Sequence, residues 1–362
     1  MLIIYIFLLL LIFILIFEFR PVKRISLKEE NITELEDSFP EVPFEKYKVI
    51  AHIHTQFSFD SLGKPSDIKK AMEENNIDFV FVTDHNNMDY KYFEDLKIFA
   101  GIEKNTPDGR MLFLGGELPV ISHPHNFEFE HYKWKGEFKK EYLYEAIVPK
   151  DAFVWNKKLA IAVFLKNLLI YPITRRLVHK WNSFVPLQEW MELYFSRARG
   201  ENLIGGLDLH VKLVYQEHTH GPMIPSYKDG FKWLQNIVYS RKKLESKKDV
   251  LNALSKGNLY ISINENYGDF LAIDEKNNSY LLGEKIPLNS TIYCKINNKK
   301  RVIILKYENK PVVITEKRQF SYPALKKGFY HFEIYEYDFK IKNLYFGFRP
   351  VILTNFFKVE ET

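Results

Sequence analysis

The chain has 362 residues, of which 46% are hydrophobic and 27% are charged, a balance typical of a globular protein that excludes a largely disordered one. Its net charge is +5 and its lysines are spread along the sequence, so charge gives no indication of a nucleic-acid partner. The single cysteine, Cys294, excludes an intramolecular disulfide and a zinc site built from several thiolates.

The N-terminal run from Met1 to Phe17 has no polar side chain except the phenol of Tyr5. Its length lies at the short end of the range that spans a bilayer. The run lacks the basic start and the small-residue cleavage site of a signal peptide. We therefore expect an uncleaved transmembrane anchor over residues 1–19, with the membrane as a partner. Because basic residues follow the run, the positive-inside tendency places the body of this single-pass membrane protein in the cytoplasm. A buried N-terminal core helix is the alternative.

The next two segments differ in pattern. Residues 20–46 are polar and charged, and they predict a linker. From Tyr47 onward, short apolar runs end in polar clusters, and helical stretches lie between several of them. Buried strands that alternate with helices are typical of an α/β domain with a parallel sheet or barrel. We expect this domain to cover residues 47–255, with the mostly helical residues 141–200 forming an insertion or cap.

The C-terminal third has a different pattern. From about Asn258, short β-type runs are separated by turn residues such as Asn277 and Asn278. This spacing predicts a small antiparallel β-sandwich over residues 256–362.

The strongest chemical signal is the pair His52 and His54. Side chains two apart on a strand point to one face, so both imidazoles can reach one metal ion at the end of the strand. The strand ends of an α/β barrel share the face where active sites lie, and imidazoles and carboxylates suit Zn²⁺, Mn²⁺ or Fe²⁺. Three further apolar runs end in such groups, namely in Asp84-His85, in His123-Pro124 and in Asp208-Leu209-His210.

These motifs resemble those of the PHP (polymerase and histidinol phosphatase) metallohydrolases. The resemblance implies a distorted (β/α)7 barrel of the TIM type, in which a di- or trinuclear centre hydrolyses phosphate mono- or diesters with a metal-activated water. It also implies that the C-terminal residues are similar to the β-sandwich that follows the barrel in some members. It covers roughly residues 47–230 and depends on the motifs His52-x-His54 with Ser58 and Asp60, Thr83-Asp84-His85, Gly101-Ile102-Glu103, His123-Pro124 and Gly206-x-Asp208-x-His210.

The resemblance also assigns ligands to two or three divalent ions. One ion would be held by His52, His54, Glu103 and Asp208. A second would be held by Asp60, His85 and His210. Glu103 would bridge towards a third ion, together with His123.

Arg110 is a departure from the family pattern, which usually has a histidine in its place. A guanidinium group has no lone pair to offer, so Arg110 cannot be a ligand. Our hypothesis is that Arg110 supplies positive charge directly, as a bidentate clamp on a substrate phosphate. The alternatives are a surface arginine, or a shifted alignment in which His125 is the ligand.

Two further signals are weaker. Asp84 is a candidate catalytic residue that would orient an imidazole or move a proton, and its alternative role is to cap the following helix. His218 and His220 form another alternating pair, but no long apolar run precedes them, so we interpret them as part of a loop near the site.

The predicted function is therefore that of a metal-dependent phosphoric ester hydrolase acting on a phosphoester substrate. Two other classes remain open. One is a metal-dependent amidohydrolase or deacetylase on a similar barrel, because a metal-activated water also attacks carbon. The other is a non-catalytic metal-binding membrane scaffold.

Overall fold

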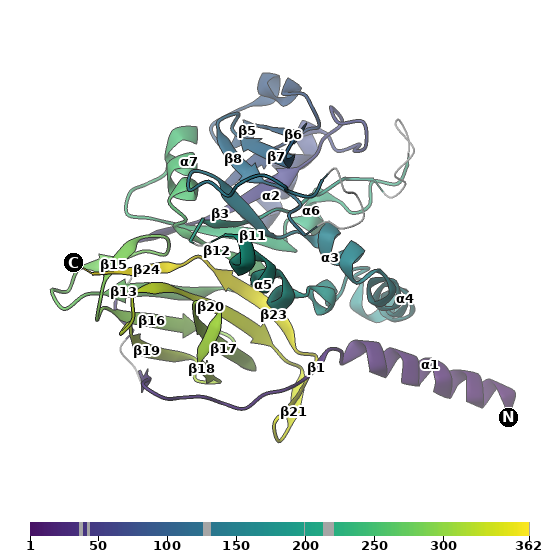
Figure 1. Ribbon diagram of the computed structural model, residues 1–362. Coiled ribbons are helices and arrows are strands. Elements are labelled where there is room, and N and C mark those ends of the chain that lie inside the picture. The colour runs from purple at the N-terminus through teal and green to yellow at the C-terminus, as the bar shows by residue number, and fades with distance from the viewer. Residues whose placement is uncertain (36–38, 42–43, 126–131, 199, 213–220, 362) are drawn as a thin grey trace.

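The computed structural model describes residues 1–35, 39–41, 44–125, 132–198, 200–212 and 221–361 (Figure 1). A central sheet runs through the molecule. Its first strands along the chain are β3 (Glu45–Ile53), β4 (Phe79–Val82) and β5 (Ile98–Ala100), which pair in parallel. The other strands join this sheet mainly in antiparallel fashion. From one edge to the other, its main strands follow the order β15 (Lys285–Pro287), β24 (Phe357–Glu360), β20 (Gly328–Glu336), β23 (Arg349–Thr354), β12 (Leu259–Ile263), β11 (Leu234–Ser240), β3, β4 and β5.

A second sheet faces the N-terminal half of the central sheet. Its strands β8, β9 and β10 are parallel, whereas β6, β7 and β8 are joined in antiparallel fashion. The order is β10 (Leu203–Gly205), β9 (Leu143–Ile147), β8 (Leu118–Ile121), β7 (Gly109–Leu114) and β6 (Ile102–Thr106).

The C-terminal part is rich in β-structure. A third sheet packs against the C-terminal half of the central sheet around a second hydrophobic core, which includes Phe270, Ile292 and Phe332. This third sheet has the order β14 (Ser279–Tyr280), β13 (Gly268–Ile273), β16 (Thr291–Ile296), β19 (Gln319–Pro323) and β2 (Thr33–Glu34). The remaining strands are β17 (Arg301–Tyr307) and β18 (Lys310–Thr315) beside β20, and a small sheet of β1 (Val22–Arg24), β22 (Leu344–Phe346) and β21 (Phe339–Ile341).

Two helices begin at residues suited to helix starts. In α2, Pro65 occupies the first turn and Asp67 accepts a hydrogen bond from the backbone of Lys64, and in α7 Ser246 and Asp249 form a capping box. The helices are α1 (Leu2–Glu18), α2 (Pro65–Asn75), α3 (Pro149–Trp155), α4 (Lys157–Thr174), α5 (Leu187–Arg197), α6 (Tyr227–Gly230) and α7 (Lys247–Ser255), with short 3₁₀ helices at Asp89–Phe93 and Trp181–Phe184.

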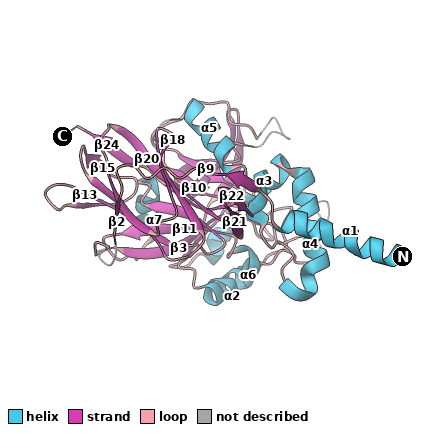
Figure 2. Cartoon of the chain, turned by 90° about the horizontal axis from the view of Figure 1, so that it is seen from below, coloured by secondary structure: helices cyan, strands magenta, loops and turns pink. Residues whose placement is uncertain are grey.

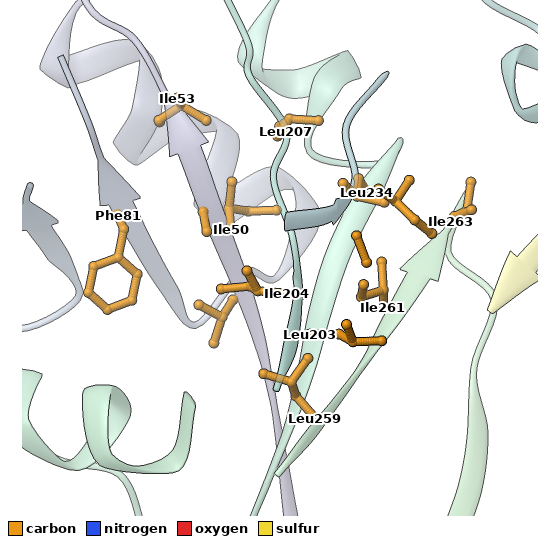
Figure 3. Close-up of a cluster of buried hydrophobic side chains, with 14 of the residues drawn as sticks. Ile50, Ile53, Phe81, Leu203, Ile204, Leu207, Leu234, Leu259, Ile261 and Ile263 are labelled. Carbon is orange, nitrogen blue, oxygen red and sulfur yellow. The ribbon is translucent and has the colours of Figure 1, made fainter. Parts of the chain in front are cut away.

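The first core lies between the central sheet and β10. Figure 3 shows Ile50 of β3, Phe81 of β4, Ile204 of β10, Leu234 of β11 and Ile261 of β12 gathered there. Their near-complete burial contributes roughly 1.5–3 kcal/mol for each side chain. This core therefore holds the ends of these strands in fixed positions.

Two buried asparagines connect β10 to the central sheet. Asn236 of β11 accepts a hydrogen bond from the N–H of Gly205 at 2.8 Å and donates one to its carbonyl at 2.9 Å. Asn355, which follows β23, does the same for Leu203, at 2.6 and 2.8 Å. Side-chain amides thus satisfy the backbone groups of β10 on the edge that faces the central sheet, where β10 has no strand partner.

The strand pairing does not confirm the predicted (β/α)7 barrel. The strands of the first half divide between two sheets that are joined by these amides and by isolated bridges such as Ile53 with Leu209. In addition, β6, β7 and β8 form antiparallel hairpins in a region where the prediction required parallel strands. The α/β class and the β-rich C-terminal region are confirmed, while the closed barrel is not.

The predicted transmembrane helix is wrong. Helix α1 has 17 residues and is therefore about 25 Å long at 1.5 Å per residue, which is shorter than the roughly 30 Å of a bilayer's hydrocarbon core. In the part of the chain that the structure describes, no helix combines the length and the apolar character needed to cross a membrane. This finding overturns the single-pass membrane localisation, which depended on that helix.

Two other segments differ from the expected pattern. Within the predicted linker, residues 20–46, strand β1 pairs with β22 and β2 pairs with β19, so this segment joins the C-terminal sheets. The segment 141–200 is mostly helical, as expected, with α3, α4 and α5, but it begins with β9, an inner strand of the second sheet.

Helix α1 lies beside α4, as Figure 2 shows, and is held at its C-terminal end by ion pairs. Lys166, fully buried in α4, donates to Glu18 at 2.8 Å. Partial burial of Glu18 favours its neutral form, but hydrogen bonds from His179, Lys166 and Lys180 hold the pKa of this carboxyl below its usual value. Glu18 is therefore a charged anchor between the two helices.

We expect Asn236→Leu to lower the free energy of unfolding by about 2–4 kcal/mol, because it leaves the buried N–H and C=O of Gly205 without partners. Chemical denaturation would measure the change. Asn252→Ala, at an exposed position of α7, is the control and should change stability little. A loss no larger than that of the control would contradict the bridging role of Asn236.

Candidate metal centre

The structure brings all eight predicted ligands together at one edge of the two sheets. His52 lies near the end of β3, Glu103 lies near the start of β6, and Asp60 lies in the loop after β3. The other five follow strands. Their nitrogen and oxygen atoms form three overlapping groups within 4.8 Å: His54, Asp60, His85 and His210; His52, His54 and Glu103; and His52, His123 and Asp208.

Local backbone geometry aims these side chains. His52, His123 and Asp208 have φ values of 63°, 49° and 45°, in the left-handed region that non-glycine residues rarely adopt. The pairing of β3 with β4 also shifts register between Ile50 and Ile53. His52 and His54 therefore converge through an irregularity in β3, and not only through the alternation of a regular strand.

Outer partners fix the orientation of four imidazole rings. Nδ1 of His52 lies 2.6 Å from Glu145, Nδ1 of His123 lies 3.0 Å from Asp151, and Nδ1 of His54 lies 3.3 Å from the hydroxyl of Ser58. In His210 the partner of Nδ1 is the backbone carbonyl of Asp208, at 3.3 Å. When Nδ1 carries the proton, Nε2 keeps its lone pair, which is the arrangement of metal-binding histidines.

The inward-facing atoms make no hydrogen bonds with the described residues, although several lie at ion-pair distance from one another. Nε2 of all four of these histidines is without a hydrogen bond, and so are oxygens of Asp60, Glu103 and Asp208, although all are buried. Such orphaned polar atoms are rare in folded proteins because each one carries a desolvation penalty. Their convergence on one point fits a cluster of ligand atoms.

The distances fit the same interpretation. Nε2 of His54 lies 3.3 Å from Asp208 and 3.4 Å from Glu103, and Nε2 of His52 lies 3.4 Å from Asp208. Two ligands that each lie about 2.1 Å from a tetrahedral ion are about 3.4 Å apart. The residues present therefore fit a divalent metal ion.

Charge in the cluster is unbalanced towards the negative. Burial disfavours the ionised form of Glu103, but His52, His123 and His85 hold the pKa of this carboxyl well below its usual value. Burial likewise favours a neutral His52, yet Glu145, Asp208 and Glu103 raise the pKa of this imidazole to about 10. Glu103 and Asp208 remain ionised, and without another cation such carboxylates favour protonation of His52, His85 and His123.

A match to a protein-family model supports this assignment. The sequence model of the PHP domain matches residues 51–266. The chain belongs to the PHP domain family. Among curated proteins, no sequence match was found. A crystal structure of a two-domain protein from Bacteroides vulgatus, containing a predicted PHP-like metal-dependent phosphoesterase, is similar at 12% identity; the match covers 92% of this chain and 99% of that chain, with a TM-score of 0.32.

Arg110 of the PHP domain is not a surface residue. It is 6% exposed, and its guanidinium lies 3.7 Å from the ring centre of Tyr132. Its Nε donates to Asn105 at 2.8 Å, and its Nη1 donates to Oε1 of Glu103 at 3.3 Å. Arg110 therefore places a buried positive charge directly beside a candidate ligand. His125, the alternative ligand, is stacked on Trp190 and belongs to none of the three groups.

Asp84 lies beside Thr55, and its predicted catalytic role stays a prediction. Its carboxylate accepts hydrogen bonds from the N–H and the hydroxyl of Thr55, at 2.6 and 2.7 Å. Burial raises the pKa of Asp84, although these hydrogen bonds oppose the rise. These hydrogen bonds stabilise the turn between His54 and the loop that carries Asp60. The pair His218 and His220 lies outside the described residues.

Sequence reasoning missed the residues that orient the ligands. Besides His52, Glu145 accepts hydrogen bonds from the hydroxyl of Ser122 at 2.8 Å and the N–H of His123 at 3.1 Å. Gly206 makes room for it, because a Cβ there would overlap the Glu145 carboxylate. A glutamate in the middle of the apolar run Leu143–Ile147 was the available signal.

We expect Glu145→Gln to lower metal affinity by about 10- to 100-fold while the fold is retained. The substitution replaces one of two acceptor oxygens with a donor, although three donors converge on this carboxylate. Competition with a chromophoric chelator would measure the affinity. Glu141→Gln, at an exposed position just before β9, is the matched control. Equal affinities in the two variants would show that Glu145 does not orient the ligands.

Proposed function

We propose that this PHP domain is a phosphoesterase that hydrolyses phosphate mono- or diesters with two divalent ions, Zn²⁺, Mn²⁺ or Fe²⁺, in the cluster described above. PHP membership and the ligand cluster indicate a metal-dependent hydrolase. When bound, such ions supply hydroxide at neutral pH and offset the charge that builds on phosphorus. The choice of phosphoesters over other substrates depends on the cations of the chain itself.

Two basic side chains at the metal centre favour a phosphoester as the substrate. Nζ of Lys150 lies 3.1 Å from Oδ2 of Asp208, and Arg110 contacts Glu103. The Lys150 side chain is 34% exposed, so it is accessible to a substrate as well. An anionic phosphate gains from two cations beside the metal ligands, whereas a neutral amide or acetyl group gains much less.

The position of Arg110 also supports two ions over three. The resemblance assigned Glu103 and His123 to a third ion. Arg110 donates to Oε1 of Glu103, the oxygen that lies 3.3 Å from Nε2 of His123. A third ion at this position would face a guanidinium group at close range, and like charges repel strongly in a buried site. In our proposal, Arg110 supplies that positive charge instead and contacts a phosphate oxygen.

The metal-loaded protein should hydrolyse aryl phosphates or phosphodiesters, and His54→Ala should lower turnover by at least about 100-fold, since it removes a ligand shared by two of the three groups. The assay would compare these esters with an aryl acetate and an anilide. His179→Ala, which removes a histidine beside α1 and outside the cluster, is the control. Turnover of the acetate or anilide alone would indicate the amidohydrolase or deacetylase class, and bound metal without any turnover would indicate a scaffold.

Arg110→Met should lower kcat/KM for phosphoesters by about 10- to 100-fold, the effect of losing one charge-assisted hydrogen bond. The number of bound ions per chain, measured by elemental analysis, should stay at two. Arg110→His tests the same idea in the opposite direction, because it replaces the guanidinium group with an imidazole that can bind a metal ion. An increase in bound metal without loss of activity in Arg110→His would sink the phosphate-clamp role.

A further inference from the structure

A cleft of about 330 Å³ opens next to the metal centre, within the volume range of small-molecule sites. Asp208 and His210, two of the candidate ligands, line one end of it together with Lys150. The rest of its lining is nonpolar and includes four aromatic residues, Phe153, Trp181, Phe184 and Trp233. A molecule in this cleft would meet charge at one end only.

The apolar part offers few hydrogen-bonding groups. The indole N–H of Trp181 already donates to Asn264 at 2.9 Å, and the lining residues Pro149 and Pro225 have no backbone N–H. A sugar or a nucleobase placed there would replace few of its hydrogen bonds to water, which is costly. An alkyl or aryl group would lose none.

The cleft also has a wall that is suited to a ligand. Phe153 in α3 is 40% exposed, although its neighbours Asp151 and Ala152 are buried. An exposed phenyl ring gains free energy when another apolar group covers it. The same helix carries Lys150, so the apolar wall and the cationic end belong to one rigid element.

We propose that this cleft binds the organic group of the substrate, and that the substrate is therefore a phosphoester of a hydrophobic alcohol, alkyl or aryl, not a sugar phosphate or a nucleotide. The inference rests on the proposed phosphoesterase function. The phosphate lies at the end lined by Lys150, Asp208 and His210, and the apolar chain extends along Phe153 and Trp233. Each methylene that enters the cleft should strengthen binding by about fourfold.

The test uses binding of non-hydrolysable probes by the full-length, metal-loaded protein. Ethyl, butyl, hexyl and octyl phosphonate are titrated by calorimetry. We expect affinity to rise by about fourfold per methylene until the cleft is filled. Phe153→Ala should reduce this increment, and Phe153→Leu should restore much of it. Phe339→Ala, which removes a comparably exposed ring in β21, is the matched control and should keep the full increment.

The outcomes separate this inference from the proposed function. Affinity that does not depend on chain length, or that is unaffected by Phe153→Ala, overturns the cleft assignment. Turnover of ribose or glycerol phosphates with kcat/KM equal to that of hexyl phosphate also overturns it, while the phosphoesterase function stands. Chain-length-dependent binding without turnover of any phosphoester supports the cleft and sinks the phosphoesterase.

Discussion

The burial of several carboxylates at one point is the constraint on which the rest of this structure depends. Glu103 and Asp208 are almost fully buried among histidines, and Glu145 and Asp151 lie directly behind them. Buried charge of one sign is costly unless cations and hydrogen bonds compensate for it. Histidines, Lys150, Arg110 and, in our proposal, bound metal ions provide that compensation. Each must be held in place, because a partner that moves by an ångström leaves a charge exposed to a low-dielectric interior.

Several of these residues are held in place by strained backbone conformations. Left-handed residues such as His52, His123 and Asp208 cost on the order of 1–3 kcal/mol each and persist only where the surroundings determine them. The surroundings here are the core of Figure 3 and the asparagine bridges to β10, the strand that leads directly to Asp208. Packing and neutral hydrogen bonds thus stabilise the edge of the sheets, where the backbone conformations of the candidate ligands are unfavourable by themselves.

The sequence predicted which candidate ligands lie together better than it predicted the strands that hold them. His54, His85 and Asp208 were recognisable because each follows a short apolar run, and the polar end of a buried strand is a local signal. Glu145 and Asp151 gave no such signal: they lie inside β9 and α3, and their roles depend on partners 93 and 28 residues away. The direction of β6–β8 was missed for a similar reason, since hydrophobic runs reveal that a strand is buried but not which way its neighbour runs.

Helix α3 shows how closely the two halves of the site are coupled. Within four residues it supplies Lys150 to Asp208, Asp151 to His123, and Phe153 to the cleft. The first two fix charges at the metal centre, and the third faces the space that the substrate would fill. A displacement of this short helix would therefore alter ligand orientation and substrate contact together. Since α4 follows α3 after a single residue and is tied to Glu18 through Lys166, the position of α3 also depends on how α1 and α4 are held.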